Sequence, residues 1–257
     1  MKKIKFLVLA VLMTQFVNAQ QVVDSAIAAN AIPVKPIKAK KKFDLSNKAS
    51  DHIMVQFGVT NWSGKPDSVR TSGFSKSFNV YGMYAFPFKS SPQFSAALGL
   101  GIGGDHIVFK NTKSFIDIAR NSPMLGFNQF SGKDSVYFKK AALINTYLEL
   151  PLELRFTSNP EKPNGSFKAA IGAKVGTMIR ATTRNRDLYS KSGALLEQKL
   201  MKESNKRFFN TTRIAATARI GYGNFSIYGA YQLTNLLKAG TGPELRPYTI
   251  GLTLSGL

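Results

Sequence analysis

From residue 51 onward, apolar residues alternate with polar or small residues, which is the two-residue period of a β-strand with two different faces. In the first such segment, Ile53, Val55, Phe57 and Val59 share one face. Several segments contain about ten residues or more, whereas ordinary strands average about five or six and membrane strands need roughly nine to eleven. The pattern predicts eight strands, over residues 53–59, 78–88, 94–102, 142–156, 167–179, 214–222, 225–233 and 248–254.

The connections between these segments alternate between short and long. The short ones cover residues 89–92, 158–166 and 223–224, and the long ones cover 63–76, 111–139, 184–207 and 235–246. An up-and-down membrane barrel has short periplasmic turns and longer outer loops. We therefore predict an all-β fold, an eight-stranded antiparallel up-and-down transmembrane β-barrel with its N-terminus in the periplasm. A soluble β-sandwich or a lipocalin-like barrel also has one apolar and one polar face, but strand length and loop asymmetry favour the membrane barrel.

In the fourth to sixth segments, the charged residues lie on the face opposite the apolar stripe. A cation on the lipid face near the midplane costs roughly 2–4 kcal/mol, so these residues, Lys168 among them, are expected in the lumen. An eight-stranded barrel has an interior just wide enough for side chains. We predict a structural plug of ion pairs; a narrow anion-preferring pore is the alternative, because positive charge is in excess. The predicted lumen ion-pair cluster is Glu149, Glu153, Arg155, Lys174, Arg180, Arg213 and Arg219.

The short turn at 158–165 predicts how the fourth and fifth strands pair. If Phe156 faces Phe167, the same register places Glu149 opposite Lys174, and Arg219 comes close to both. Small residues of the third strand are expected to make room for large side chains from the opposite wall, and they are Ser95, Ala97, Gly99, Gly101 and Gly103. Aromatic residues near strand ends predict interfacial girdles, and they are Trp62, Phe88, Phe94, Phe156, Phe225 and Tyr248.

The longer loops carry an excess of cations, most clearly in the segment 184–207. Arginine and lysine bind phosphate well, so outward-facing cations are expected beside lipopolysaccharide phosphates. Simple solubility is the alternative explanation of this charge. The predicted lipopolysaccharide-facing loop cations are Arg184, Arg186, Lys191, Lys199, Lys202, Lys206 and Arg207.

The N-terminal segment has the pattern of a targeting signal. Lys2, Lys3 and Lys5 precede an apolar run over 6–13, and Val17-Asn18-Ala19 forms a small-residue cleavage pattern. We predict a cleavable signal peptide over 1–19; a short N-terminal membrane anchor is the alternative. Residues 20–50 predict a disordered basic periplasmic arm, either a solvated linker or a tether for anionic headgroups. The outer-membrane β-barrel is expected over 51–257.

Composition narrows the chemistry. The formal net charge is +21, which is typical of nucleic-acid binding, but an exported barrel does not meet nucleic acid, and we expect no such partner. There is no cysteine, which excludes a disulfide framework and thiolate metal ligation. The histidines, His52 and His106, lack metal-ligand spacing, so we expect no metal and no cofactor. Asp105-His106 with a nearby serine would suit a lipid A deacylase; a polar strand end is the preferred interpretation.

One short motif carries a family resemblance. Tyr147-Leu148-Glu149-Leu150-Pro151-Leu152 resembles the Tyr-Leu-Glu-Ile-Pro-Leu segment of the PorT-like outer-membrane β-barrel proteins of Bacteroidetes. The resemblance implies an eight-stranded outer-membrane barrel in a family that mostly lacks an assigned activity and whose namesake serves a protein secretion and gliding system. The chain departs from the usual pattern of such barrels by ending in Leu257 rather than an aromatic residue.

The functional expectation is a non-enzymatic outer-membrane barrel, structural or part of an envelope or secretion assembly. A small anion-preferring channel and, after it, a lipid-modifying outer-membrane enzyme are the alternatives. The expected partners are outer-membrane lipid, lipopolysaccharide and envelope proteins.

Overall fold

The computed structural model describes residues 52–67, 69–72, 75–109, 114–119, 121–129, 137–190 and 192–256. The predicted signal peptide, residues 1–19, and the predicted arm, residues 20–50, lie outside these ranges. Within the described residues, no helix is long and apolar enough to span a membrane.

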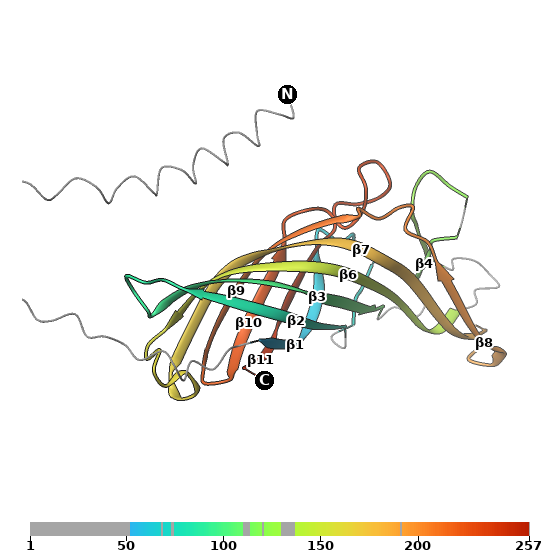
Figure 1. Ribbon diagram of the computed structural model, residues 1–257. Coiled ribbons are helices and arrows are strands. Elements are labelled where there is room, and N and C mark those ends of the chain that lie inside the picture. Colours follow the sequence, from blue (N-terminus) through green and yellow to red (C-terminus); the bar gives the residue numbers. More distant parts are fainter. Residues whose placement is uncertain are drawn as a thin grey trace, which may run out of the picture. The chain divides into compact units, whose positions relative to one another are not determined.

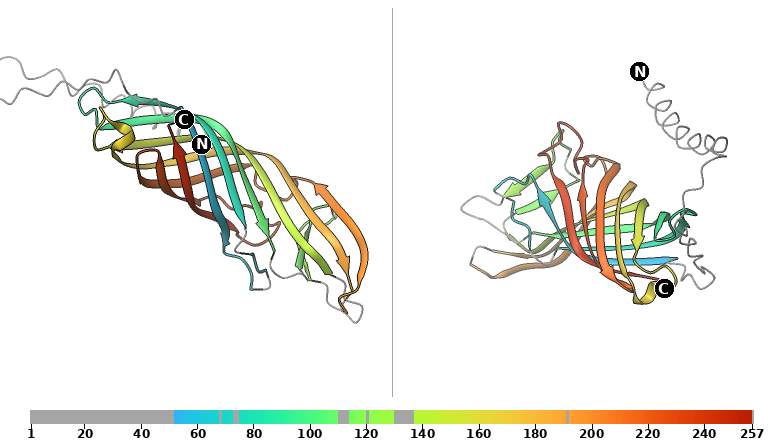
Figure 2. Two further views of the ribbon diagram at one scale, coloured as in Figure 1. Left: turned by 90° about the horizontal axis from the view of Figure 1, so that it is seen from below. Right: turned by 90° about the vertical axis from the view of Figure 1, so that its left-hand side faces the viewer.

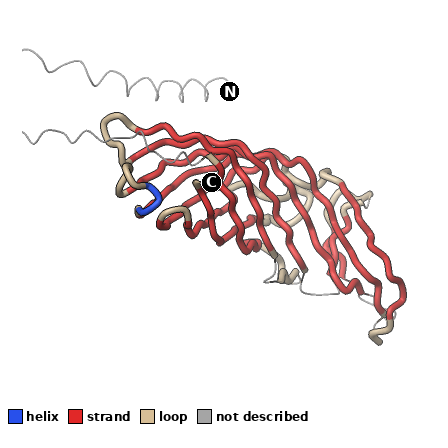
Figure 3. The backbone as a smooth tube through the Cα atoms, turned by 60° about the horizontal axis from the view of Figure 1, so that its bottom comes forward, coloured by secondary structure: helices blue, strands red, loops and turns tan. Residues whose placement is uncertain are grey.

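Eight antiparallel strands form a closed barrel, as predicted (Figure 1, Figure 3). Each barrel strand pairs with its neighbours along the chain, β6 follows β3 directly in the wall, and the first and last strands pair to close the sheet. Closure leaves the membrane-spanning wall without a free edge, which a bilayer requires. The barrel strands are β1 (Ile53–Ser63), β2 (Lys76–Pro87), β3 (Phe94–Val108), β6 (Tyr137–Thr157), β7 (Phe167–Tyr189), β9 (Thr212–Tyr222), β10 (Phe225–Gln232) and β11 (Arg246–Ser255).

The two faces of this wall differ in chemistry, because successive side chains of a strand point to opposite sides. Large apolar side chains such as Phe57, Leu152 and Ile250 point outward and are exposed, as expected where lipid rather than water is the neighbour. Polar side chains such as Gln56 and Thr253 point inward and are buried, and these two are joined by a hydrogen bond of 3.2 Å.

Short connections lie at one end of the barrel and long ones at the other (Figure 2). At the turn end are the three short connections, one of which contains the short helix η1 (Pro163–Gly165), together with the start of β1 and the end of β11. Phe94 and Phe156 lie at this end with ring centroids 5.2 Å apart. The prediction that Trp62 belongs to an interfacial girdle is wrong. Its side chain is 3% exposed and points into the barrel, because it lies an even number of residues from the inward-facing Gln56 and Thr60.

The long loops contain strands that the sequence pattern did not predict. Strands β4 (Ser114–Asp117) and β5 (Gly126–Gln129) form a hairpin, and β8 (Leu195–Ser204) pairs with β7. Both predicted connections do join barrel strands, but 184–207 is mostly strand, and 111–139 contains the β4–β5 hairpin. Apolar alternation fades there because the outward positions no longer face lipid, although backbone pairing continues. Strands β6 and β7 reach 21 and 23 residues and extend as a sheet past the barrel wall (Figure 1, Figure 3).

At the loop end, the barrel interior is filled by an apolar cluster. Loop residues such as Phe208, Phe209 and Leu245 pack against inward residues of the strands such as Leu143 and Ile107. Each of these side chains is buried, so this apolar cap covers the interior on the side of the long loops.

Gly101 provides a test of the inward packing. A Cβ there would overlap the Val80 carbonyl oxygen and the Tyr81 ring, whereas a Cβ at outward-facing Gly82 would find its nearest atom 3.8 Å away. We expect Gly101→Ala to lower the free energy of unfolding by about 1–3 kcal/mol through overpacking. Urea titration in lipid vesicles measures it, with Gly82→Ala as the matched control. Equal midpoints for both variants would contradict the assigned inward face.

Candidate functional site

Glu149, in the middle of β6, is the centre of a buried polar cluster in the lumen. Its Oε2 accepts hydrogen bonds from Lys174 Nζ at 3.1 Å and from the Tyr81 hydroxyl. Its other oxygen, Oε1, lies 3.2 Å from Arg213 Nη1. The residue is 0% exposed, so protein groups rather than water surround its charge: Oε2 is hydrogen-bonded, whereas Oε1 has the charge of Arg213 beside it but no hydrogen bond.

Arg213 connects this glutamate to a second carboxylate. Its Nη1 lies 3.0 Å from Asp105 Oδ2 on β3, and its guanidinium lies 4.6 Å from the centroid of the Tyr147 ring. An arginine that meets two carboxylates and an aromatic face is held by charge and by cation–π attraction together.

A second cluster lies nearer the turn end. Glu153 Oε2 accepts hydrogen bonds from Arg155 Nε at 2.8 Å and from Arg219 Nη2 at 3.0 Å. All three side chains are buried. The two clusters together balance three carboxylates against four cations, so charge is nearly compensated where desolvation would otherwise be costly.

Small residues on the flanking strands create the room for the glutamates. The cross-strand partners of Glu149 are Gly101 and Gly176, and a Cβ at Gly103 would lie 2.6 Å from Glu149 Oε2. The prediction that small residues of the third strand make room for large lumen side chains is therefore confirmed for Gly101 and Gly103. They accommodate side chains of adjacent strands, however, because Glu149 lies on the strand next to β3 and not on the opposite wall.

Of the predicted lumen set, Arg180 is the exception. The β6–β7 register shifts between Thr146 and Tyr147, which leaves Ile179 as an extra residue on β7. The bulge reverses the inward–outward alternation beyond it, so Arg180 is exposed on the outer face. The residues that the structure does bring together in the lumen are Glu149, Glu153, Arg155, Lys174, Arg213 and Arg219.

The predicted hairpin register is wrong by two residues. Phe156 pairs with Ala169 rather than with Phe167, and Lys174 pairs with Pro151. A shift of two preserves which face each side chain occupies, so Lys174 still reaches Glu149 diagonally. Arg219, in contrast, reaches the other glutamate, Glu153.

Asp105 and Tyr81 are lumen residues that the sequence reasoning missed. Asp105 continues the inward row of Gly99, Gly101 and Gly103, so parity alone would have placed it there. Its neighbour His106 points outward and is exposed. Adjacent strand residues face opposite sides, so the structure does not bring Asp105 and His106 together as a catalytic pair. Among the described residues, no group of three potential ligands could hold a metal ion.

The predicted loop cations fall into separate places. Arg184 and Arg186 point outward from the extended part of β7, and Lys199 and Lys202 lie on β8. Lys206 donates a 3.3 Å hydrogen bond to the Met178 carbonyl of β7, and Arg207 donates one of 3.1 Å to the Ser122 carbonyl in the loop before β5, so both bind other parts of the chain itself. Lys191 lies outside the described residues.

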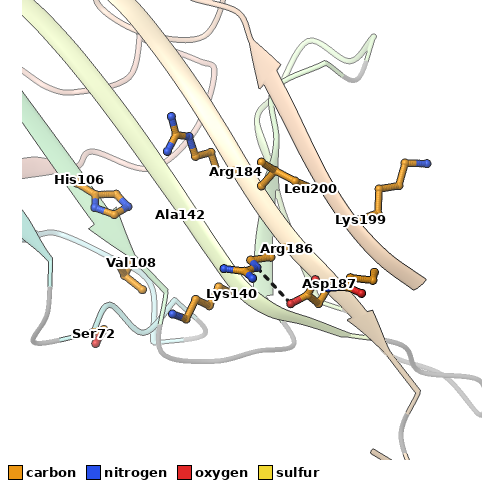
Figure 4. Close-up of a pocket in the computed structure, with 11 residues that line it drawn as sticks. Ser72, His106, Val108, Lys140, Ala142, Arg184, Arg186, Asp187, Lys199 and Leu200 are labelled. Atoms are coloured by element: carbon orange, nitrogen blue, oxygen red, sulfur yellow. Dashed lines mark ion pairs between the residues drawn. The ribbon is translucent and has the colours of Figure 1, made fainter. Parts of the chain in front are cut away.

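A groove of about 990 Å³ lies on the outer wall across β3, β6, β7 and β8. Figure 4 shows Ala142 between His106 and Arg184, with Lys140 and Arg186 further along the same face. Arg186 Nε is 3.3 Å from Asp187 Oδ2, the ion pair drawn in Figure 4. Asp187 lies at a second irregularity of β7 and has a φ of 51°, a left-handed conformation that is uncommon outside glycine.

A closed antiparallel barrel with an apolar outer belt and an ionic interior defines an outer-membrane β-barrel protein. Residues 45–238 match the model of the family described as outer membrane protein beta-barrel domain. The chain belongs to this family, and its location is the outer membrane.

Other comparisons add less. No curated protein matches the chain. Among solved structures, it is similar to Ail, the attachment invasion locus protein of Yersinia pestis, at 13% identity and a TM-score of 0.34. That match covers 79% of this chain and 94% of Ail.

The Glu149 cluster allows a charge-neutralisation test of coupling. Glu149→Gln leaves Lys174 and Arg213 near each other without their shared carboxylate, and breaking a buried pair in this way costs about 3–5 kcal/mol. We expect Lys174→Met to restore part of that loss, because Arg213 keeps Asp105 as its partner. Urea unfolding midpoints in lipid vesicles give the coupling energy.

The second cluster supplies the control. Glu153→Gln should be destabilising too, but Lys174→Met should not rescue it, because Glu153 is paired with Arg155 and Arg219. Strictly additive losses in the Glu149→Gln/Lys174→Met double variant would refute coupling between these two residues.

Proposed function

We propose that this outer-membrane barrel is non-enzymatic and non-conducting, and that it anchors an extracellular β-sheet that serves as a component of an envelope assembly. The observation that carries this proposal is the length of β6 and β7. A membrane strand needs roughly 9–11 residues, and these strands have 21 and 23. About 10–12 residues of β6 and about 12–14 residues of β7 are in excess of the span. At about 3.3 Å per residue, the excess is more than 30 Å of strand.

The excess length supports a surface for protein partners. Strand β8 pairs with β7 on one side, and within the described residues no strand pairs with its other edge. Such an edge presents unpaired backbone groups, which proteins use for strand addition. Exposed apolar side chains accompany this edge, and they are Leu195, Leu196, Leu200 and Met201.

The β4–β5 hairpin lies against this sheet, because β4 contacts β6 and β7. Burial, together with the nearby Asp117 carboxylate of β4, raises the pKa of Glu203 on β8. Two carboxyl groups from separate strands thus share one neighbourhood, which indicates that the hairpin and β8 lie close together.

The lumen argues against the channel alternative. Glu149 and Arg213 are 0% and 3% exposed, and the apolar cap of Phe208, Phe209 and Leu245 covers the loop end. The charged groups in the middle of the barrel are almost inaccessible to water. An ion that crossed the lumen would have to displace side chains whose charges are already paired.

The finer family assignment is also part of this proposal. The Tyr147–Leu152 motif supports a PorT-like member of the barrel family and hence a secretion-related assembly. In the structure, this motif supplies Glu149 to the lumen and Tyr147 to the Arg213 site, so its polar residues have a role inside the barrel.

Planar bilayer recordings test the plugged lumen. We expect no stepwise conductance from protein whose folded state is verified by faster gel migration before boiling than after. Regular steps with anion selectivity from the same verified sample would favour the channel instead.

Photocrosslinking in native outer membrane tests the exposed sheet edge. A photoreactive residue at Leu196 on β8 should trap one discrete envelope protein, and Leu200→Glu in the same chain should abolish the product by placing a charge on that edge. A photoreactive residue at exposed Asn164, in the turn at the opposite end, is the control. No product at Leu196, or the same product at Asn164, would contradict a partner on β8.

A further inference from the structure

We propose that the outer wall across β3, β6, β7 and β8 binds a phosphorylated glycolipid of the outer leaflet, with its phosphate in the cationic groove and an acyl chain in an apolar hollow beside it. The groove shares Leu200 with the exposed edge of β8, but the cations on which the proposal depends, Lys140 and Arg184, lie on β6 and β7. The success or failure of this proposal therefore does not decide the function proposed above.

The cations of the groove are brought to the surface by the bulge at Ile179. Before the bulge, even-numbered residues of β7 such as Lys174 point into the lumen. Beyond it, Arg180, Arg184 and Arg186 point outward and are exposed. Ile179 is itself one of the last exposed apolar residues of β7. The basic outer face of the strand begins directly after it.

The register then pairs like charges directly. Arg184 lies opposite Lys202 of β8, and Arg186 lies opposite Lys140 of β6. Like charges directly opposite each other destabilise a sheet. Arg184 and Arg186 are also two residues apart on one face, about 7 Å along the strand. A merely solvated surface does not require this arrangement, whereas a bound anion would turn its repulsion into attraction.

Acidic partners compensate only part of this charge. Arg186 pairs with Asp187 at 3.3 Å and Lys199 pairs with Glu197 at 3.4 Å. In the part of the chain that the structure describes, Arg184 and Lys140 have no carboxylate within ion-pair distance. Arginine and lysine together match a phosphate group, through bidentate hydrogen bonds and a point charge respectively.

A second hollow, of about 570 Å³, adjoins the groove and has the opposite chemistry. It shares His106 with the groove and is lined by outward apolar side chains of β1, β2 and β3, including Phe57, Phe78 and Ile102. Lys76, the cross-strand partner of His106, lines it as well. The apolar hollow lies on the lipid-facing wall and the cationic groove continues from it beyond the lipid-facing part, so together they fit an amphipathic anion and not a free phosphate. The long loops define the outer side of the membrane, so the lipid belongs to the outer leaflet.

The test uses the folded barrel in phosphatidylcholine vesicles with and without lipid A carrying two phosphates. Binding to the native state should raise the unfolding midpoint of the wild type by linkage. In the Arg184→Gln/Lys140→Gln variant, the affinity for lipid A should fall on the order of tenfold or more. In phosphatidylcholine alone, the same variant should be at least as stable as the wild type, because one member of each like-charge pair is gone. If the cations had a purely structural role, the variant would not be as stable as the wild type without lipid A and less stable than the wild type with it.

The controls separate charge from lipid. Lys162→Gln/Lys238→Gln removes two exposed cations outside the groove and should leave the lipid A effect unchanged. Dephosphorylated lipid A should stabilise the wild type much less, and millimolar inorganic phosphate should not displace the lipid. Gly104→Leu, which projects into the apolar hollow, should weaken lipid A binding without loss of folding, because a Cβ there meets only ordinary contacts at 3.7 Å and beyond.

Several results would overturn the proposal. They are an undiminished lipid A effect in the Arg184→Gln/Lys140→Gln variant, an equal loss in the Lys162→Gln/Lys238→Gln control, and an equal effect of dephosphorylated lipid A. Full displacement by inorganic phosphate would identify a general anion site instead of a lipid site.

Discussion

Most features of this barrel depend on one constraint: each strand separates a lipid face from a narrow lumen, and consecutive side chains must alternate between them. Outside, a charge is costly, and Phe57, Leu152 and Ile250 meet lipid. Inside, an eight-stranded wall leaves room only for side chains. The lumen therefore has to be filled, and here polar groups fill its middle. Glu149 is the clearest case, because glycines on both neighbouring strands leave it space, and a tyrosine and two cations surround it.

A single extra residue in β7 changes which side chains point into the lumen and which point outward. Ile179 interrupts the parity of β7, so the strand supplies a lumen cation, Lys174, on one side of the bulge and outward arginines on the other. One continuous strand thereby contributes to a buried ionic network in the membrane and to a basic outer face beyond it. The bulge is the structural feature that connects these two chemistries, in agreement with the common role of bulges in redirecting side chains.

Beyond the belt, different forces organise the chain. The apolar cap around Phe208 and Phe209 is a conventional hydrophobic core formed by loops, shielded from lipid by the wall and from water by its own packing. Strands β6 and β7 continue with β8 as a sheet that is exposed on its free edge. The closed wall thus anchors the chain in the membrane, and its extension exposes a sheet edge outside the membrane.

The sequence by itself determined the class of fold, the eight spanning strands and the inward face of most charged residues, because lipid on one side imposes a strict two-residue period. It also determined which chemistry would fill the lumen. Only the tertiary structure decided the partners: that Arg213 joins Glu149 to Asp105, that Arg219 pairs with Glu153, and that Arg180 lies outside. Register, closure and a one-residue bulge are properties of strand pairing, and a periodic pattern is unchanged by a shift of two residues. Strands β4, β5 and β8 were likewise hidden from the pattern, because no lipid face marks them.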